Sequence, residues 1–171
     1  MREHVRDQRL AWMTGGVIIG LSIALYWPAE PAYALAVDRA ERFAMCSVPT
    51  QTGTSDALFV LDFVTGRLVG AAFNSQAGGF TEFYIREISG DFNVKAGSDA
   101  EYIMVPARTE FRAIAGAGQT GSPAIGSIYI GELNSGQVSL YGFMYRSAPR
   151  PSPPQELVKV ATFPFRETFG N

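Results

Sequence analysis

Hydrophobic and polar positions divide the chain into two parts with different patterns. Residues 10–27, LAWMTGGVIIGLSIALYW, form a run of eighteen residues without a charge. As a helix this run would be about 27 Å long, close to the hydrocarbon thickness of a bilayer. From about residue 42 onward, short apolar runs alternate with turn residues, which predicts β-strands. Between the two parts, a short helix is predicted over 31–42, where Pro31 suits a first turn.

The flanks of the apolar run predict its orientation in a membrane. Basic residues precede it and aromatic residues mark its ends, as in membrane-spanning helices: Arg2, Arg6, Arg9, Trp12, Tyr26 and Trp27. We therefore expect a cytoplasmic tail over 1–9, a transmembrane helix over 10–27, a linker over 28–41 and an extracytoplasmic all-β domain over 42–171. The expected location is a bacterial cytoplasmic (inner) membrane, crossed once, with the C-terminal domain in the periplasm. A cleaved signal peptide ending near Ala32-Tyr33-Ala34 is the alternative.

Small residues recur every fourth position along the predicted helix. Gly16, Gly20 and Ala24 would share one helix face. Small residues at this spacing let two membrane helices approach closely. They are the candidate helix-packing residues.

The second part of the chain repeats one order of strands. The first half predicts strands over 42–49, 57–63, 67–73 and 80–88, and the second half over 101–107, 127–133, 137–143 and 156–165. Each half is therefore expected to form a four-stranded antiparallel unit. The fold class is all-β, with an N-terminal transmembrane helix followed by two pseudo-repeated units.

A hairpin occurs twice at the centre of this repeat. Residues 57–73, ALFVLDFVTGRLVGAAF, align without a gap on residues 127–143, SIYIGELNSGQVSLYGF. The turns fall at Thr65-Gly66 and Ser135-Gly136, where glycine supplies the positive φ of a tight turn. The acid before each turn, Asp62 or Glu132, is expected to accept hydrogen bonds from turn amides.

These hairpins resemble the blade repeats of β-propellers, in which turns of the pattern x-x-L-D-x-x-T-G-x-L are frequent. The chain also resembles a small bacterial family that has a signal-like N-terminus, an LDF-x-TG hairpin and no assigned activity. Two blades cannot close a propeller. The two units are expected either to pack face to face as a sandwich or to be completed by other chains. The irregular stretches 115–126 and 146–155 are expected to be loops.

The composition argues against several kinds of chemistry. His4 is the only histidine and lies in the predicted tail, so the domain has no histidine for a catalytic triad or a zinc site. Cys46 is the only cysteine and has no visible activating neighbour. The pattern G-x-G-x-x-G at 116–121 is followed by no predicted helix. No catalytic, metal or cofactor residue is predicted, and the protein is expected not to be an enzyme.

The charge pattern indicates which kinds of partner the protein can bind. The net charge is −2 and no run of basic residues occurs, so nucleic acid is not expected as a partner. Arg108, Arg112, Arg146 and Arg150 lie near the irregular loops and are candidate partner contacts. The expected function is a non-catalytic, membrane-anchored structural or accessory subunit, in contact with the lipid bilayer, that docks on other protein subunits or on itself. An extracytoplasmic ligand-binding module of propeller or lectin type is the alternative.

Overall fold

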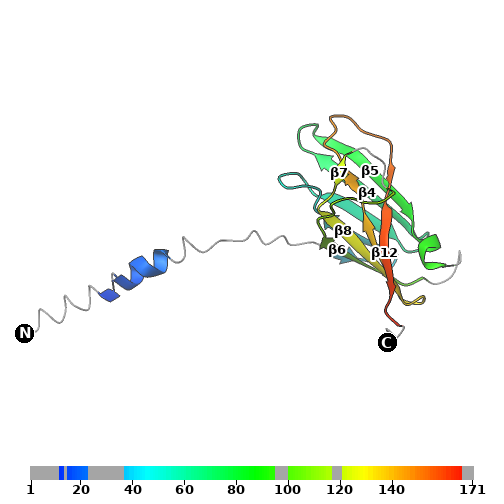
Figure 1. Cartoon of the computed structure of the whole chain (residues 1–171), viewed down its shortest axis with the longest axis horizontal. Helices are drawn as coiled ribbons and strands as arrows, with labels where there is room; N and C mark the ends of the chain where they lie inside the picture. Colours follow the sequence, from blue (N-terminus) through cyan, green and yellow to red (C-terminus); the bar gives the residue numbers. More distant parts are fainter. Residues whose placement is uncertain (1–11, 14, 23–36, 95–99, 117–120, 167–171) are drawn as a thin grey trace, which may run out of the picture. The chain divides into compact units, whose positions relative to one another are not determined.

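The computed structural model describes residues 12–13, 15–22, 37–94, 100–116 and 121–166. The chain divides into two compact units, Met1–Ala34 and Leu35–Asn171. The described part of the second unit forms three β-sheets (Figure 1). The β-rich character expected from the sequence is confirmed.

The first unit contains a short helix. Helical residues are described at 12–13 and 15–22, and the Ser22 hydroxyl donates a hydrogen bond of 2.8 Å to the carbonyl of Ile18. Eight helical residues extend about 12 Å, less than half of a bilayer core. Across the described ranges, no helix combines the length and apolar character needed to cross a membrane.

This finding corrects two expectations. The predicted transmembrane helix over 10–27 and the predicted single-pass location in the inner membrane are wrong. The apolar run has the composition of a membrane helix, but only residues 12–13 and 15–22 of it are described as helical. Residues 10, 11, 14 and 23–27 of that run, and the alternative cleavage triplet at 32–34, lie outside the described residues.

Sheet A has six strands in the order β1-β2-β3-β4-β5-β11. The strands are β1 (Val37–Arg39), β2 (Phe43–Val48), β3 (Ala57–Asp62), β4 (Arg67–Asn74), β5 (Gly79–Glu87) and β11 (Gln155–Glu156). Neighbours are antiparallel except β11, which runs parallel to β5. The predicted four-stranded first unit is therefore wrong, because β1 and β11 extend it at both edges. β1 also replaces part of the helix predicted over 31–42.

Sheet B has four antiparallel strands in the order β12-β9-β8-β6. They are β6 (Tyr102–Arg108), β8 (Gly126–Glu132), β9 (Gln137–Gly142) and β12 (Val158–Pro164). Sheet C pairs β7 (Ser122–Pro123) with β10 (Met144–Tyr145), and a short 3-10 helix, η1 (Ser89–Phe92), follows β5. β7 and Gln155 of β11 lie in stretches that were expected to contain no strand.

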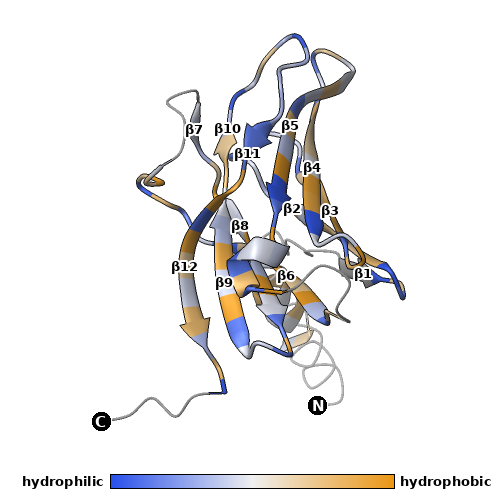
Figure 2. Cartoon of the chain, turned by 90° about the vertical axis from the view of Figure 1, so that its right-hand side faces the viewer, coloured by the Kyte–Doolittle hydropathy of each residue, from blue (hydrophilic) through white to orange (hydrophobic). Residues whose placement is uncertain are grey.

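Sheets A and B enclose one hydrophobic core. Figure 2 shows two layers, one made of β1–β5 and the other of β6, β8, β9 and β12. Between them Phe59, Tyr84 and Phe143 contact one another, with ring centroids 4.9–5.7 Å apart. Gly70 lies between Phe59 and Tyr84 across three strands, and a Cβ there would come within 2.3 Å of the Phe59 ring. The missing side chain at Gly70 is what lets the ring lie flat over β4.

The two similar hairpins turn opposite faces to this core. Phe59 is buried, whereas its aligned counterpart Tyr129 is exposed. Val60 faces outward, whereas its counterpart Ile130 is fully buried. The hairpins therefore share a turn but not an environment, and the expectation of two equivalent units is wrong. Side chains alternate between the faces of a strand, so aligned residues can be buried in one hairpin and exposed in the other.

Candidate functional site

The outer face of sheet A is apolar over four adjacent strands. Alternation along β2–β5 turns one set of side chains away from the core. The apolar members of this set, here called outer face A, are Phe43, Met45, Leu58, Val60, Val69, Ala71, Phe73, Phe80, Phe83 and Ile85. Val69 is 43% exposed and Phe80 is 49% exposed. Exposed antiparallel sheet faces are usually polar, so this surface is unusual.

The cross-strand pairs arrange outer face A in rows. One row contains Met45, Val60, Val69 and Ile85, and the next contains Ser47, Leu58, Ala71 and Phe83. At the far end Phe73 and Phe80 contact each other edge to face, with centroids 5.8 Å apart. At the near end a charged row crosses the sheet, with Asp62, Arg67 and Glu87. The surface is therefore an apolar rectangle bordered on one side by charges.

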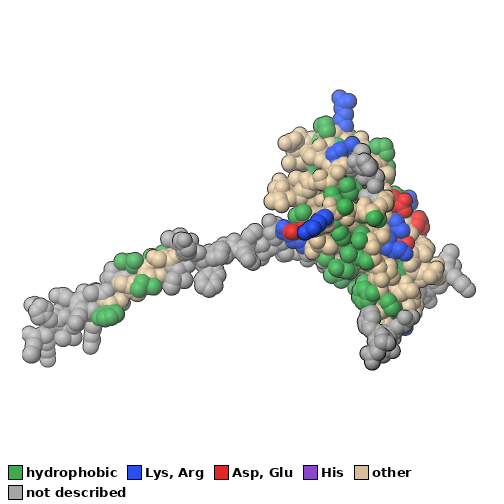
Figure 3. Space-filling view, viewed as in Figure 1, with side chains coloured by type: hydrophobic (Ala, Val, Ile, Leu, Met, Phe, Trp, Pro, Cys, Tyr) green, Lys and Arg blue, Asp and Glu red, His purple; other side chains and the backbone are tan. Residues whose placement is uncertain are grey.

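The outer face of sheet B is apolar as well. Its outward side chains, here called outer face B, are Ile103, Val105, Tyr129, Val138, Leu140, Ala161 and Phe163. Figure 3 shows hydrophobic side chains gathered over β6, β8 and β12. Phe111 and Ile114 cover one end of this surface, because a Cβ on Gly142 would come within 3.0 Å of both.

The sheet edges are poorly suited to strand addition. In sheet A the edge strands β1 and β11 have three and two residues. In sheet B, β6 contains Pro106, which has no amide hydrogen to donate. β12 has a bulge after Lys159 and ends at Pro164. Short strands, proline, bulges and inward-facing lysine are the devices that protect sheet edges, so faces rather than edges offer contact area.

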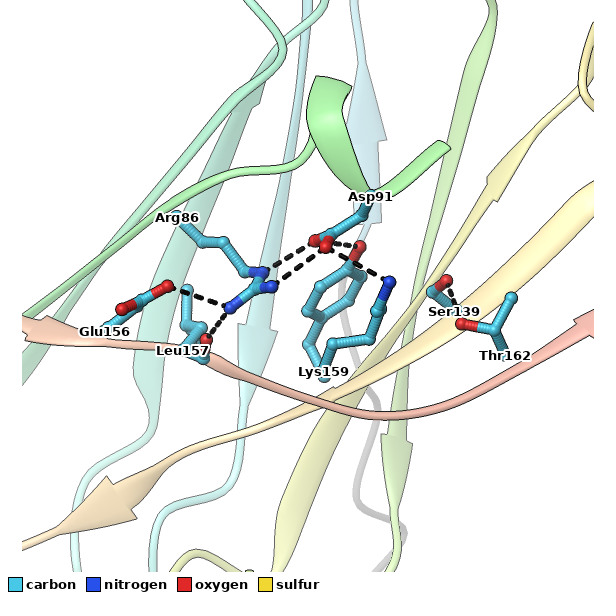
Figure 4. A network of polar contacts seen from close by, with 8 residues as sticks. Arg86, Asp91, Ser139, Glu156, Leu157, Lys159 and Thr162 are labelled. Carbon is cyan, nitrogen blue, oxygen red and sulfur yellow. Dashed lines mark hydrogen bonds and ion pairs between the residues drawn. The ribbon is translucent and has the colours of Figure 1, made fainter. Parts of the chain in front are cut away.

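A polar network joins four elements between the sheets (Figure 4). Arg86 on β5 forms a bidentate ion pair with Asp91 on η1, at 2.6 and 2.9 Å. Asp91 also accepts a hydrogen bond of 3.0 Å from the Tyr141 hydroxyl and pairs with Lys159 at 3.2 Å. Burial opposes ionisation of Asp91, but these donors outweigh it and hold its pKa below the ordinary value. A carboxylate with all these partners has a structural role.

The same guanidinium reaches the C-terminal segment. Arg86 donates 2.7 Å to the carbonyl of Leu157 and 3.0 Å to the Glu156 carboxylate. The Asp91 hydrogen bond raises the pKa of Arg86 further. Among the residues that the structure describes, no cluster of three or more metal-binding side chains occurs.

A second buried acid anchors the proline-rich segment after β10. Glu82 is fully buried and accepts a hydrogen bond of 2.6 Å from Gln155. Arg146 lies 3.5 Å from the same carboxylate. Ser152 donates from its backbone and its hydroxyl to the carbonyl of Thr81. This segment is therefore fastened along β5, although the sequence indicates only an irregular loop.

The predicted turn residues lie in matching turns. Gly66 and Gly136 have φ of 65° and 66°. Asp62 accepts hydrogen bonds from Val64 and Thr65, and Glu132 accepts them from Asn134 and Ser135. The expected role of both acids as acceptors for turn amides is confirmed. These residues shape hairpins and form no reactive site.

The four predicted arginine contacts belong to separate surroundings. Arg108 pairs with Glu110 at 2.9 Å, and Arg146 pairs with Glu82. Arg112 and Arg150 are exposed in the segments after β6 and after β10. That arginines contact a partner stays a prediction.

The predicted helix-packing residues and the single cysteine form no reactive site among the described residues. Gly16 and Gly20 belong to the short helix, and nothing described lies within 4 Å of a Cβ built on either. Ala24 lies outside the described residues. Cys46 is buried, and burial raises the pKa of its thiol to about 12. A thiol in this environment is a packing residue.

Among the described residues, hollows of different size occur at two places. The larger, about 430 Å³, is lined by Phe92, Asn93, Val94, Ala100, Glu132, Asn134 and Ser135. Its carboxylate is already engaged by the turn amides, and residues 95–99, between two lining residues, are outside the described ranges. The smaller, about 100 Å³, lies beside Thr54, Asn74 and Tyr145. The larger hollow therefore offers no unengaged carboxylate, and the smaller is lined mainly by serine, threonine, asparagine and glutamine side chains.

Sequence reasoning missed outer faces A and B. The signal was present in the run ALFVL over 57–61, which lacks the polar alternation of a half-exposed strand. Such a run is typical of a strand covered on both faces. Comparison of the chain with models of protein families, with curated proteins and with solved structures finds no match to any of them.

Proposed function

We propose that this protein is a non-catalytic structural or accessory subunit, and that its β domain docks on other protein chains through outer faces A and B. The observation that carries the proposal is the pair of apolar sheet faces. Large contiguous apolar patches on a folded domain mark interaction surfaces. A sandwich that worked alone would ordinarily have polar outer faces.

The polar residues favour the same role. In the described part of the chain, the acids Asp62, Glu82, Asp91 and Glu132 lie at separate places and each has a structural partner. An active site needs groups that converge on a substrate and are not already engaged. The blunted edges direct the docking to the faces, where large apolar side chains provide binding energy.

The proposal is tested by placing one charge in each face. Val69→Lys and Val105→Lys change exposed residues of outer faces A and B, and Thr52→Lys, in an exposed turn, is the matched control. Full-length chain is purified from the cells that make it, and the mass of each recovered assembly is measured. We expect a stoichiometric assembly with the wild type and the control, and at least about a tenfold loss with one of the face variants.

Two results would overturn the proposal. One is a wild-type chain that comes without any other protein and stays monomeric at concentrations up to about 100 μM. The other is an assembly that keeps its composition in both face variants. Thermal melting of each variant shows that the fold is retained, since an exposed substitution changes stability little.

A further inference from the structure

Building on the proposed function, we propose that the occupant of outer face A is a second copy of this chain. The two copies would pack face to face, related by a two-fold axis that runs parallel to the strands between β3 and β4. This operation places β3 of one copy opposite β4 of the other, and β2 opposite β5. Interfaces of this kind are isologous, so the surface must complement itself.

The central pair of the charged row meets this requirement, whereas at the ends of the row Phe43 would face Glu87 of the second copy. Asp62 and Arg67 are cross-strand neighbours on β3 and β4. The two-fold axis therefore brings the carboxylate of each copy opposite the guanidinium of the other, and does so twice. Within one chain the Arg67 guanidinium makes a long ion pair with Glu87, at 3.9 Å, and both side chains are more than half exposed. The Arg67 guanidinium therefore has room for another acceptor. Opposite charges that coincide under the symmetry operation favour the second copy over an unrelated partner.

The apolar rows complement themselves in size. In one row Val60 would face Val69 of the second copy, and Met45 would face Ile85. In the next row the large Leu58 would face the small Ala71. In the same row the large Phe83 would face the small Ser47. Large side chains opposite small ones allow two sheets to interdigitate at the usual separation of about 10 Å.

The same argument does not extend to outer face B. Phe111 and Ile114 already cover one of its ends, and its rows contain no pair of opposite charges. Outer face A extends over four strands of about six residues, or about 20 Å by 20 Å. The two copies together would bury about 800 Å², which is below the about 1,200 Å² of stable specific interfaces and fits a weak, transient dimer. The dimer is therefore expected to dissociate in the micromolar range and to require measurement up to about 100 μM.

A charge exchange tests the geometry directly. Asp62→Arg alone would place an introduced guanidinium opposite that of Arg67, and Arg67→Asp alone would place two carboxylates opposite each other. Each full-length variant should self-associate at least about tenfold more weakly than the wild type. Mixed together, the two variants regain both ion pairs. The mixture should associate within about threefold of the wild type, measured by sedimentation velocity.

A second measurement does not depend on these charges, because Asp62→Arg also removes acceptors from the hairpin turn. Val69→Cys places a thiol near the proposed axis, and Cys46 is buried and unreactive. A short bismaleimide should join Val69→Cys chains into covalent dimers at micromolar concentration. Thr52→Cys, on an exposed turn, should remain uncoupled.

The outcomes separate this inference from the proposed function. If the mixed charge variants fail to associate and Val69→Cys gives no covalent dimer, the second-copy proposal is wrong. If Val69→Lys still loses a different stoichiometric protein in that case, docking through outer face A stands. Charge complementation together with coupling at position 69 would support the dimer.

Discussion

At the scale of single residues, Asp91 connects four elements of the fold. Its carboxylate joins η1 to β5 through Arg86, to β9 through Tyr141 and to β12 through Lys159. Its side chain is 10% exposed. Removal of one partner from a nearly buried ion pair leaves an uncompensated charge, which is costly.

Asp91→Asn is therefore expected to lower the free energy of unfolding by about 2–4 kcal/mol at pH 7. The pKa of Asp91 is lowered on folding, so its stabilisation is fully present above the ordinary value of 3.8 and is lost as the pH falls through the lower folded value. The difference between wild type and variant should shrink below about pH 4. Urea unfolding between pH 2 and 7 measures this difference in the free energy of unfolding.

Glu87→Gln is the matched control for this effect. Glu87 also pairs with an arginine, but its side chain is 68% exposed and the pair is long, at 3.9 Å. Exposed pairs contribute little. If the free energy of unfolding depended on pH equally in both variants, the Asp91 network would stabilise the fold no more than an exposed ion pair does.

At the scale of elements, the two hairpin turns have the same backbone but different neighbours. A Cβ on Gly66 would lie 2.9 Å from the Ser89 Cβ and 3.3 Å from its amide nitrogen. A Cβ on Gly136 would instead meet the side chain of Arg166 at 2.8 Å. A long arginine side chain can move aside, whereas the backbone of η1 cannot do so without disturbing the network around Asp91.

Gly66→Ala is accordingly expected to destabilise the protein more than Gly136→Ala. Both substitutions impose a left-handed conformation on alanine, at about 1–2 kcal/mol. The rigid contact at Gly66 should add about 1–3 kcal/mol. Thermal or urea unfolding of the two variants in parallel gives the comparison, and equal losses would contradict the role assigned to Ser89.

Elements fixed by local sequence could be predicted, and those fixed by distant contacts could not. The hairpin turns followed from Thr65-Gly66 and Ser135-Gly136, where glycine relieves a local strain. Glu156 falls in the strand predicted over 156–165, but the parallel pairing of Gln155 and Glu156 with β5 could not be predicted, because it depends on the contacts of the proline-rich segment with Glu82 and Thr81. Nothing in the two residues themselves favours this pairing.

At the scale of the whole molecule, the C-terminal segment fastens sheet A to sheet B. β11 pairs with β5 in sheet A, and β12 pairs with β9 in sheet B. Leu157 lies between them, fully buried, and donates from its backbone to the carbonyl of Ile85. One residue thus marks the point where the chain changes sheets.

Leu157→Ala should therefore lower the stability of the whole domain by about 2–5 kcal/mol, as other buried leucine truncations do. Val160→Ala, on the exposed side of β12, is the matched control and should change stability by less than about 1 kcal/mol. Calorimetry should show one transition shifted in Leu157→Ala. A separate, earlier transition would mean that the two sheets unfold independently.

The sequence was less informative about the candidate site than about the strands. Its alternation identifies strands, but the run around Val60 is apolar at consecutive positions, so it does not show which side chains face outward. The position of outer face A depends on which side chains of each strand pack in the core, and this is set by tertiary contacts such as the packing of Phe59 over Gly70.

Apolar residues on both faces of β3 and β4 also affect how reliably the hairpin aligns its strands during folding. A slip of one residue would exchange the inner and outer side chains. In most sheets such a slip buries charges and is rejected, but here it would mostly replace one apolar side chain with another. The turn at Gly66, with its Asp62 acceptor, then has to select the correct alignment largely without help from the hydrophobic effect.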